Sequence, residues 1–97
     1  MELKVATVLS AEVHPNADRL LVLRVSLGDE ERQIVAGIRA HYEPHTLIGR
    51  QVLVVANLAP ATLRGVESQG MVLAASAGDA VVVISPERPV PAGSVVR

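Results

Sequence analysis

Two histidines four residues apart are the first residues in this sequence whose spacing could do chemistry. His41 and His45 would share one face of a helix at that spacing. Zinc needs three or four protein ligands, but His14 is the only other histidine and cysteine is absent. Pro44 also lies inside the pair, where it would interrupt a helix. The pattern therefore favours two surface histidines beside a turn, and no metal site is expected.

A second candidate is the segment 65–70, whose two glycines have the Gly-x4-Gly spacing of a phosphate-binding loop. Such loops continue with Lys and then Ser or Thr, whereas Met71 and Val72 follow here. Ser68 does not stand in a Gly-x-Ser-x-Gly nucleophile elbow, and the acidic residues are too scattered to indicate an acid–base pair. The sequence therefore predicts a non-catalytic protein without a cofactor.

Charge and aromatic content limit how this chain could bind nucleic acid. Nine basic and ten acidic residues give a net charge of −1, so the chain is not a polycation that binds through bulk charge. Tyr42 is the only aromatic residue. Stacking on rings is worth about 1–3 kcal/mol per base in proteins that follow single strands, and this chain has no row of rings. A sequence-tolerant single-strand binder is therefore disfavoured.

Two polar segments contain side chains that could form a binding rim. Residues 14–20 and 57–71 supply the donors Arg19, Arg64, Ser68 and Gln69. The alternative is a pair of ordered turns, in which side chains cap backbone N–H groups and glycines adopt positive φ. The residues with those roles would be Asn16, Asp18 and Asn57 as caps and Gly65 and Gly70 as the glycines. The residues alone leave both interpretations open.

The elements that must position these segments are predicted to be almost all strands. Runs rich in β-branched residues indicate strands at 3–13, 20–27, 31–37, 50–58, 70–75 and 80–85, with a last edge strand near 93–96. The first is expected to be long and curved, with the odd-numbered residues from Leu3 to Val13 on one face. Pro44 and Gly49 bracket a short helical turn, and 59–69 is expected to be a link.

Three strands, a helix position and two strands form the order of one known small barrel. This order predicts an all-β, five-stranded OB-fold barrel with one short helical turn and extra C-terminal strands. An SH3-like barrel or a small sandwich is the alternative. Barrels of the OB type bind nucleic acid through strand faces and connecting loops.

The length and composition are those of one domain. The 97 residues are 49% hydrophobic and 20% charged, and neither an internal repeat nor a domain boundary is visible, so 1–97 is expected to be a single domain. No apolar run approaches the ~20 residues of a membrane span, and the N-terminus does not resemble a signal peptide. A cytoplasmic protein is therefore expected.

Four segments, in order and without large gaps, carry a resemblance over nearly the whole chain. They read HPNADRLL at 14–21, QIVAGI at 33–38, VANL at 55–58 and LRGVESQGM at 63–71. Together they resemble the tRNA-binding domain family. That family includes the OB-fold domain at the C-terminus of methionyl-tRNA synthetases, free-standing tRNA-binding proteins and endothelial monocyte-activating polypeptide. The resemblance implies non-catalytic, structure-specific tRNA binding.

The resemblance also implies which residues bind. In the family, tRNA binding is linked to a basic residue near the first segment and to the Ser and Met of Ser-x-Gly-Met. The matching residues in this sequence are Arg19, Ser68 and Met71. For Met71 the alternative is core filling. We add Gln69 as a further donor, Arg64 for phosphate contact and Asn57 for loop shaping or a base edge.

The partners implied by the resemblance are tRNA, a second copy of this chain in a homodimer, and a synthetase catalytic region in a longer parent chain. The first strand begins at Leu3, so a synthetase appendage is the favoured origin. The net charge is lower than in many members, which predicts modest affinity unless the basic residues cluster. The alternative function is a secretion-chaperone-like protein that binds unfolded peptides through an apolar dimer groove.

Overall fold

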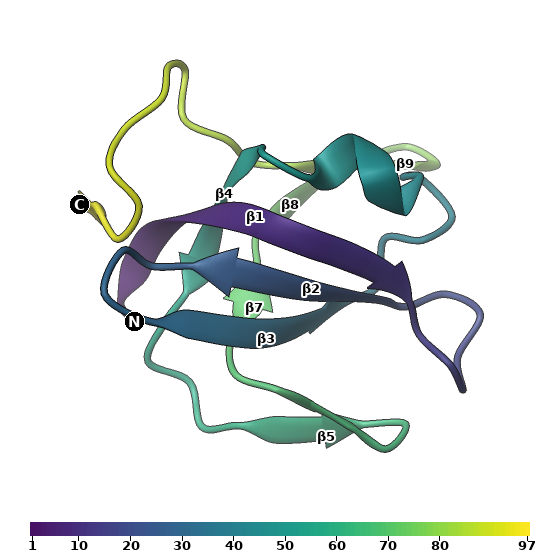
Figure 1. Ribbon diagram of the computed structural model, residues 1–97. Helices are drawn as coiled ribbons and strands as arrows, with labels where there is room; N and C mark the ends of the chain where they lie inside the picture. The colour runs from purple at the N-terminus through teal and green to yellow at the C-terminus, as the bar shows by residue number, and fades with distance from the viewer.

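A computed structural model of residues 1–97 places the first strand at the centre of the fold (Figure 1). β1 (Leu3–Val13) pairs antiparallel with β2 (Leu21–Ser26) through residues 7–13. It pairs antiparallel with β4 (Gln51–Val55) through residues 3–7. One long, bent strand therefore belongs to both halves of the sheet, as the sequence predicts.

A register shift between Val8 and Ser10 bends this strand. Before the shift the even-numbered Ala6 and Val8 belong to the core, and after it the odd-numbered Ala11 packs against the core. Ala6 and Val8 are buried, whereas Leu9 and Val13 are exposed. The expected single face of odd-numbered residues is therefore wrong, because the core side chains change from even to odd positions at a bulge that the alternating pattern does not reveal.

The remaining strands close the sheet into a barrel of the predicted OB type. β3 (Glu31–Ala36) pairs with β2, and β7 (Met71–Val72) pairs with β4, which gives the order β3-β2-β1-β4-β7. The two outer edges then meet, because Gln69 N–H donates to Gln33 O at 2.8 Å. The 3-10 turn η1 (Pro44–Leu47) lies between β3 and β4, where the sequence predicts a short helical turn.

The barrel interior is aliphatic. Its fully buried large side chains are Val8, Leu21, Leu23, Val25, Ile34, Leu47, Val52 and Val54. Each such side chain contributes about 1.5–3 kcal/mol on burial. Leu47 comes from η1, so the turn adds a side chain to the core. Tyr42 packs against this cluster, and its hydroxyl accepts the Val83 N–H at 3.0 Å.

The expected link at 59–69 is a hairpin, and the expectation of a loop there is wrong. β5 (Ala61–Leu63) pairs with β6 (Val66–Ser68) across a two-residue turn, Arg64-Gly65. Both turn residues have positive φ, 54° for Arg64 and 90° for Gly65, as a type I′ turn requires. Asn-Gly is the usual pair in such turns, and an L-residue other than Asn or Gly costs about 1–2 kcal/mol in this conformation. Because Arg64 stands where Asn is usual, the sequence does not indicate this turn.

The C-terminal third adds strands outside the barrel. The predicted strand 70–75 is divided into β7 and a second strand that begins at Ala74, and Leu73 between them donates its N–H to Leu53 O at 2.9 Å. β8 (Ala74–Ala77) and β9 (Ala80–Val83) form a separate hairpin. β10 (Val95–Val96) pairs with the start of β1, which confirms the last edge strand.

Candidate nucleic-acid interface

Arg19 and Arg64 come from two loops that meet at one end of the barrel. Arg19 lies in the 14–20 loop between β1 and β2, and Arg64 lies at the tip of the β5–β6 hairpin. The Arg64 Nη2 donates to Asn16 O at 3.3 Å, which joins the hairpin tip to the 14–20 loop. Both arginines are exposed, and neither has an acidic partner. The structure thus brings together the two arginines that sequence analysis singled out.

A buried histidine, which sequence analysis did not include in the site, fixes this junction. His14 is 3% exposed. Its Nδ1 accepts the Asn16 N–H at 2.9 Å, so the ring proton is on Nε2, which donates to Leu63 O at 3.0 Å. The ring therefore connects the 14–20 loop to the residue before Arg64. Residues 14 and 63 are far apart in sequence, and no local pattern reveals their contact.

Ser68 and Gln69 are at the seam of the barrel and not on a rim beside the arginines. The Ser68 hydroxyl accepts the Val35 N–H at 2.9 Å and donates to Gly70 O at 3.0 Å, and the residue is 4% exposed. The Gln69 Oε1 accepts the Gln33 N–H at 3.0 Å. The expectation of a free donor at a rim is therefore not met for the Ser68 hydroxyl, whereas the Gln69 amide nitrogen has no hydrogen-bond partner in the protein.

Asn57 and Met71 differ in whether their side chains remain free to contact a ligand. The Asn57 Oδ1 accepts the Glu2 N–H at 2.7 Å, which fits the loop-shaping role. Met71 is 52% exposed, so the core-filling alternative for this residue is wrong. It stands on β7 next to the barrel seam and offers an apolar, polarisable contact to a partner.

Arg32 shows how an arginine can be unavailable to a ligand. Its Nη1 donates to the carbonyl oxygens of Ala56 and Gln69, and its Nη2 pairs with Glu30 at 2.8 Å. Like Gln69, it ties β3 to the segment that enters β7. Its guanidinium is therefore part of the barrel closure.

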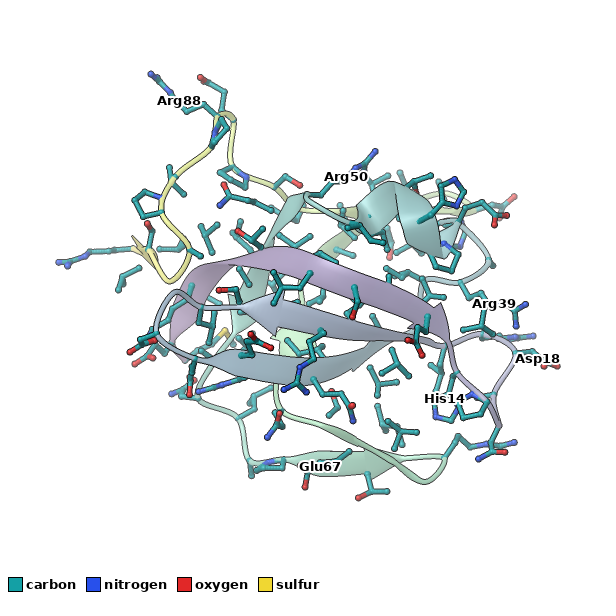
Figure 2. All side chains as sticks on the ribbon, in the orientation of Figure 1. His14, Asp18, Arg39, Arg50, Glu67 and Arg88 are labelled. Carbon is teal, nitrogen blue, oxygen red and sulfur yellow. The ribbon has the colours of Figure 1, made fainter.

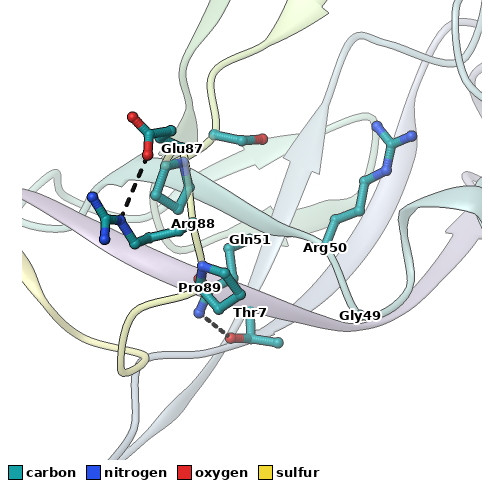
Figure 3. Close-up of a pocket in the computed structure, with 9 residues that line it drawn as sticks. Thr7, Gly49, Arg50, Gln51, Glu87, Arg88 and Pro89 are labelled. Atoms are coloured by element: carbon teal, nitrogen blue, oxygen red, sulfur yellow. Dashed lines mark hydrogen bonds and ion pairs between the residues drawn. The ribbon is translucent and has the colours of Figure 1, made fainter.

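A separate groove lies under the C-terminal tail (Figure 3). It is open and polar, and it lies between residues 49–51 and 85–89. Gln51 crosses it, with Nε2 donating to Thr7 Oγ1 at 3.1 Å and to Val90 O. Glu87 pairs with Arg88 at 3.5 Å on its rim. These contacts attach the tail to β4, and the groove holds no pairing of a nucleophile with a base.

Membrane insertion by a helix has no support in the structure, because none of its helical segments is both long enough and apolar enough to cross a bilayer.

The chain matches a family model described as "Putative tRNA binding domain" over residues 3–95. It is 48% identical to the methionine–tRNA ligase of Thermococcus kodakarensis over 97 residues, which are 100% of this chain and 13% of that protein. It is 54% identical to the corresponding enzyme of Methanococcus aeolicus over 96 residues, which are 99% of this chain and 14% of that protein. The chain thus spans only about one seventh of these curated relatives.

Two solved structures show the same barrel. One is a MetRS-related protein from Pyrococcus horikoshii, with a TM-score of 0.92, 39% identity, and coverage of 99% of this chain and 89% of that one. The other is the chaperone CsaA from Bacillus anthracis str. Ames, with a TM-score of 0.89, 30% identity, and coverage of 99% and 90%. The matched residues, the barrel and these relatives together show that the chain belongs to the tRNA-binding domain family. It is a non-catalytic OB-fold domain of the kind found in methionyl-tRNA synthetases.

Proposed function

We propose that this domain binds folded tRNA through the end of the barrel that carries Arg19 and Arg64. The observation that carries the proposal is the junction of the 14–20 loop with the β5–β6 hairpin, where two arginines without acidic partners lie on loops joined by the Arg64–Asn16 hydrogen bond. In OB folds, the loop between the first two strands and the loop before the last strand commonly bind nucleic acid. These are the two loops in question.

Recognition of a folded RNA fits this surface better than recognition of a single strand. Tyr42 is the one aromatic ring in the chain. Its hydroxyl accepts the Val83 N–H, and its ring lies 6.0 Å from the Arg50 guanidinium. Binding through phosphates and 2′-hydroxyls reads the shape of an RNA helix without rings. Met71 adds an exposed apolar contact, whereas Ser68, Gln69 and Asn57 act by holding the loops in place.

The relatives suggest where such binding is useful. The chain corresponds to a small part of methionine–tRNA ligases, so we propose that it raises tRNA affinity for a cytoplasmic synthetase whose catalysis is performed elsewhere. A region that binds the folded body of tRNA increases the effective concentration of substrate at a linked active site.

A homodimer is part of the proposal, with the β8–β9 hairpin and the adjacent Ile84 as its contact surface. All four residues of β8 are exposed, and Val82 and Ile84 are 47% and 37% exposed. A second copy of this chain would cover this apolar surface and join two arginine surfaces on one tRNA. Light scattering should give a dimer mass for the parent, and Val82→Glu should give a monomer with a similar melting temperature. A monomeric parent would refute the dimer.

The test of the RNA class is a competition experiment. Labelled tRNA bound to the domain is challenged with unlabelled folded tRNA, with poly-U of equal length, and with an unfolded peptide. Folded tRNA should compete best because the surface offers phosphate contacts and no stacking platform. Equal competition by poly-U would refute recognition of folded RNA. Competition by the peptide would favour the chaperone-like alternative, since one structural neighbour is a chaperone.

A further inference from the structure

The basic residues of this chain divide into paired and unpaired groups. Four of the nine form ion pairs: Lys4 with Glu2, Arg24 with Glu31, Arg32 with Glu30 and Arg88 with Glu87. Among the five without an acidic partner, two are hydrogen-bonded to the short backbone segment 16–19, and a third belongs to that segment. These three are Arg19, Arg39 and Arg64.

Arg39 is the member of this group that no motif marks. Its Nη1 donates to Asp18 O at 3.4 Å, and its backbone N–H donates to Arg19 O at 3.3 Å. Figure 2 shows Arg39 and Asp18 side by side at the end of the barrel where His14 lies. At the start of the same segment, Arg64 donates to Asn16 O. Residues 16–19 are thus hydrogen-bonded by the side chains of two arginines and include a third arginine.

The chemistry of these contacts leaves positive charge for a ligand. Backbone carbonyls are neutral, so they orient a guanidinium without cancelling its charge. Arg39 and Arg64 each use one of five N–H donors, and both side chains are exposed. Asp18 is the one acidic residue in the segment, and its carboxylate makes no ion pair. Three arginines against one aspartate leave a positive balance at this segment, which favours a phosphate ligand that arginine can bind in a bidentate manner.

Arg64 gives an independent indication that this cluster is kept for binding. It is the only residue other than glycine with positive φ, and it occupies a turn position at which Asn is the usual residue. A residue in an unfavourable backbone conformation is expected where its side chain is needed for function. No contact of Arg64 other than that to Asn16 accounts for arginine at this position.

We propose that Arg39 joins Arg19 and Arg64 in one site for RNA backbone phosphates, and that His14 is the positioning residue of this site. The proposal rests on the proposed RNA-binding function and names the groups that perform it. His14 reaches Asn16 with one ring nitrogen and Leu63 with the other, so it sets the distance between the loop of Arg19 and the hairpin of Arg64. Adjacent phosphates of one strand can then contact arginines from different loops.

Arg39→Ala tests the third member of the site, with Arg50→Ala as the matched control. Arg50 is also exposed and without an acidic partner, but it lies over Tyr42 and away from residues 16–19 (Figure 2). Binding is measured with folded tRNA and with a short RNA duplex. We expect Arg39→Ala to weaken both by about 10-fold and to reduce the salt slope by about 0.7–0.9, as one lost phosphate contact should. Arg50→Ala should change binding less than about 2-fold.

His14→Gln and His14→Asn separate positioning from folding. A Gln amide places its nitrogen near the Nε2 position and keeps the bond to Leu63 O, whereas Asn keeps only the contact at the Nδ1 position. Gln should retain binding within about 3-fold of the parent, and Asn should lose about 10-fold with a reduced salt slope. Equal binding by the two variants would overturn the positioning role.

The two RNA probes distinguish failure of this inference from failure of the proposed function. If the parent binds tRNA and Arg39→Ala binds like the parent, Arg39 is not part of the site. If duplex and tRNA bind equally but Arg39→Ala weakens both, the phosphate site stands and the preference for folded tRNA is wrong. If neither RNA binds the parent, both proposals are refuted.

Discussion

Gly70→Ala is expected to lower the free energy of unfolding by about 3 kcal/mol, because it disturbs both the packing and the backbone at the barrel seam. A Cβ at this position would lie 2.9 Å from Val55 O and 3.4 Å from the Ile34 Cδ1. The backbone φ of 150° is also one that residues with side chains rarely adopt. The carbonyl of Gly70 accepts the Ser68 hydroxyl, so a shift of this residue would also break this part-buried hydrogen bond.

Two other glycines provide the controls for this measurement. A Cβ at Gly78 would meet nothing within 4 Å, but φ is 62°, so Gly78→Ala reports backbone strain alone, of about 1 kcal/mol. At Gly37 a Cβ would make an ordinary contact of 3.8 Å with the Leu20 Cδ2, so Gly37→Ala should be nearly neutral. Urea denaturation of the three variants gives the comparison. A Gly70→Ala variant no less stable than Gly78→Ala would contradict the packing argument at the barrel seam.

The sheet could be predicted because its strands are patterned locally. β-Branched runs mark β1 to β4, and Pro44 marks η1 within the range that the sequence predicts. The β5–β6 hairpin could not be predicted in the same way. Arg64 occupies a turn position at which Asn or Gly is usual, so the sequence of this segment resembles an irregular link.

The site could be predicted only as a set of residue types. Arginines in polar loops indicate exposure, and exposure is what the structure shows for Arg19 and Arg64. The direction of the Ser68 hydroxyl depends on Val35, a residue 33 positions away in the sequence. The role of His14 depends likewise on Leu63, 49 positions away. Contacts between distant segments decide which polar residues hold the fold and which remain for a ligand.

This division suggests how stability and binding are separated in a domain of 97 residues. The polar groups at the barrel seam are hydrogen-bonded within the protein, and every buried side-chain polar atom has a partner. The arginines at the end of the barrel are held only by backbone carbonyls, so removing their side chains should affect the fold little. Substitutions at the barrel seam should therefore lower the free energy of unfolding, whereas substitutions of the arginines at the end of the barrel should weaken RNA binding.

The double variant Arg19→Ala/Arg64→Asn is expected to weaken tRNA binding by at least about 100-fold, since hydrogen bonds to charged groups are worth about 1.5–3 kcal/mol each. Asn is chosen at position 64 because it tolerates the positive φ of the turn, so the melting temperature should stay the same or rise. The control is Arg24→Ala/Arg88→Ala, which removes the same charge from two exposed arginines that are paired with acidic residues elsewhere.

Salt dependence shows whether the lost affinity belongs to phosphate contacts or to net charge. Three or four contacts give the parent a log–log slope of about −2 to −4, and each lost contact removes about 0.7–0.9 of it. The double variant should therefore have a slope smaller by about 1.4–1.8, whereas the control should keep the parent's slope because its arginines lie away from the 14–20 loop. If both double variants lose affinity and slope alike, binding depends on overall charge. The arginines at the end of the barrel would then have no special part in it.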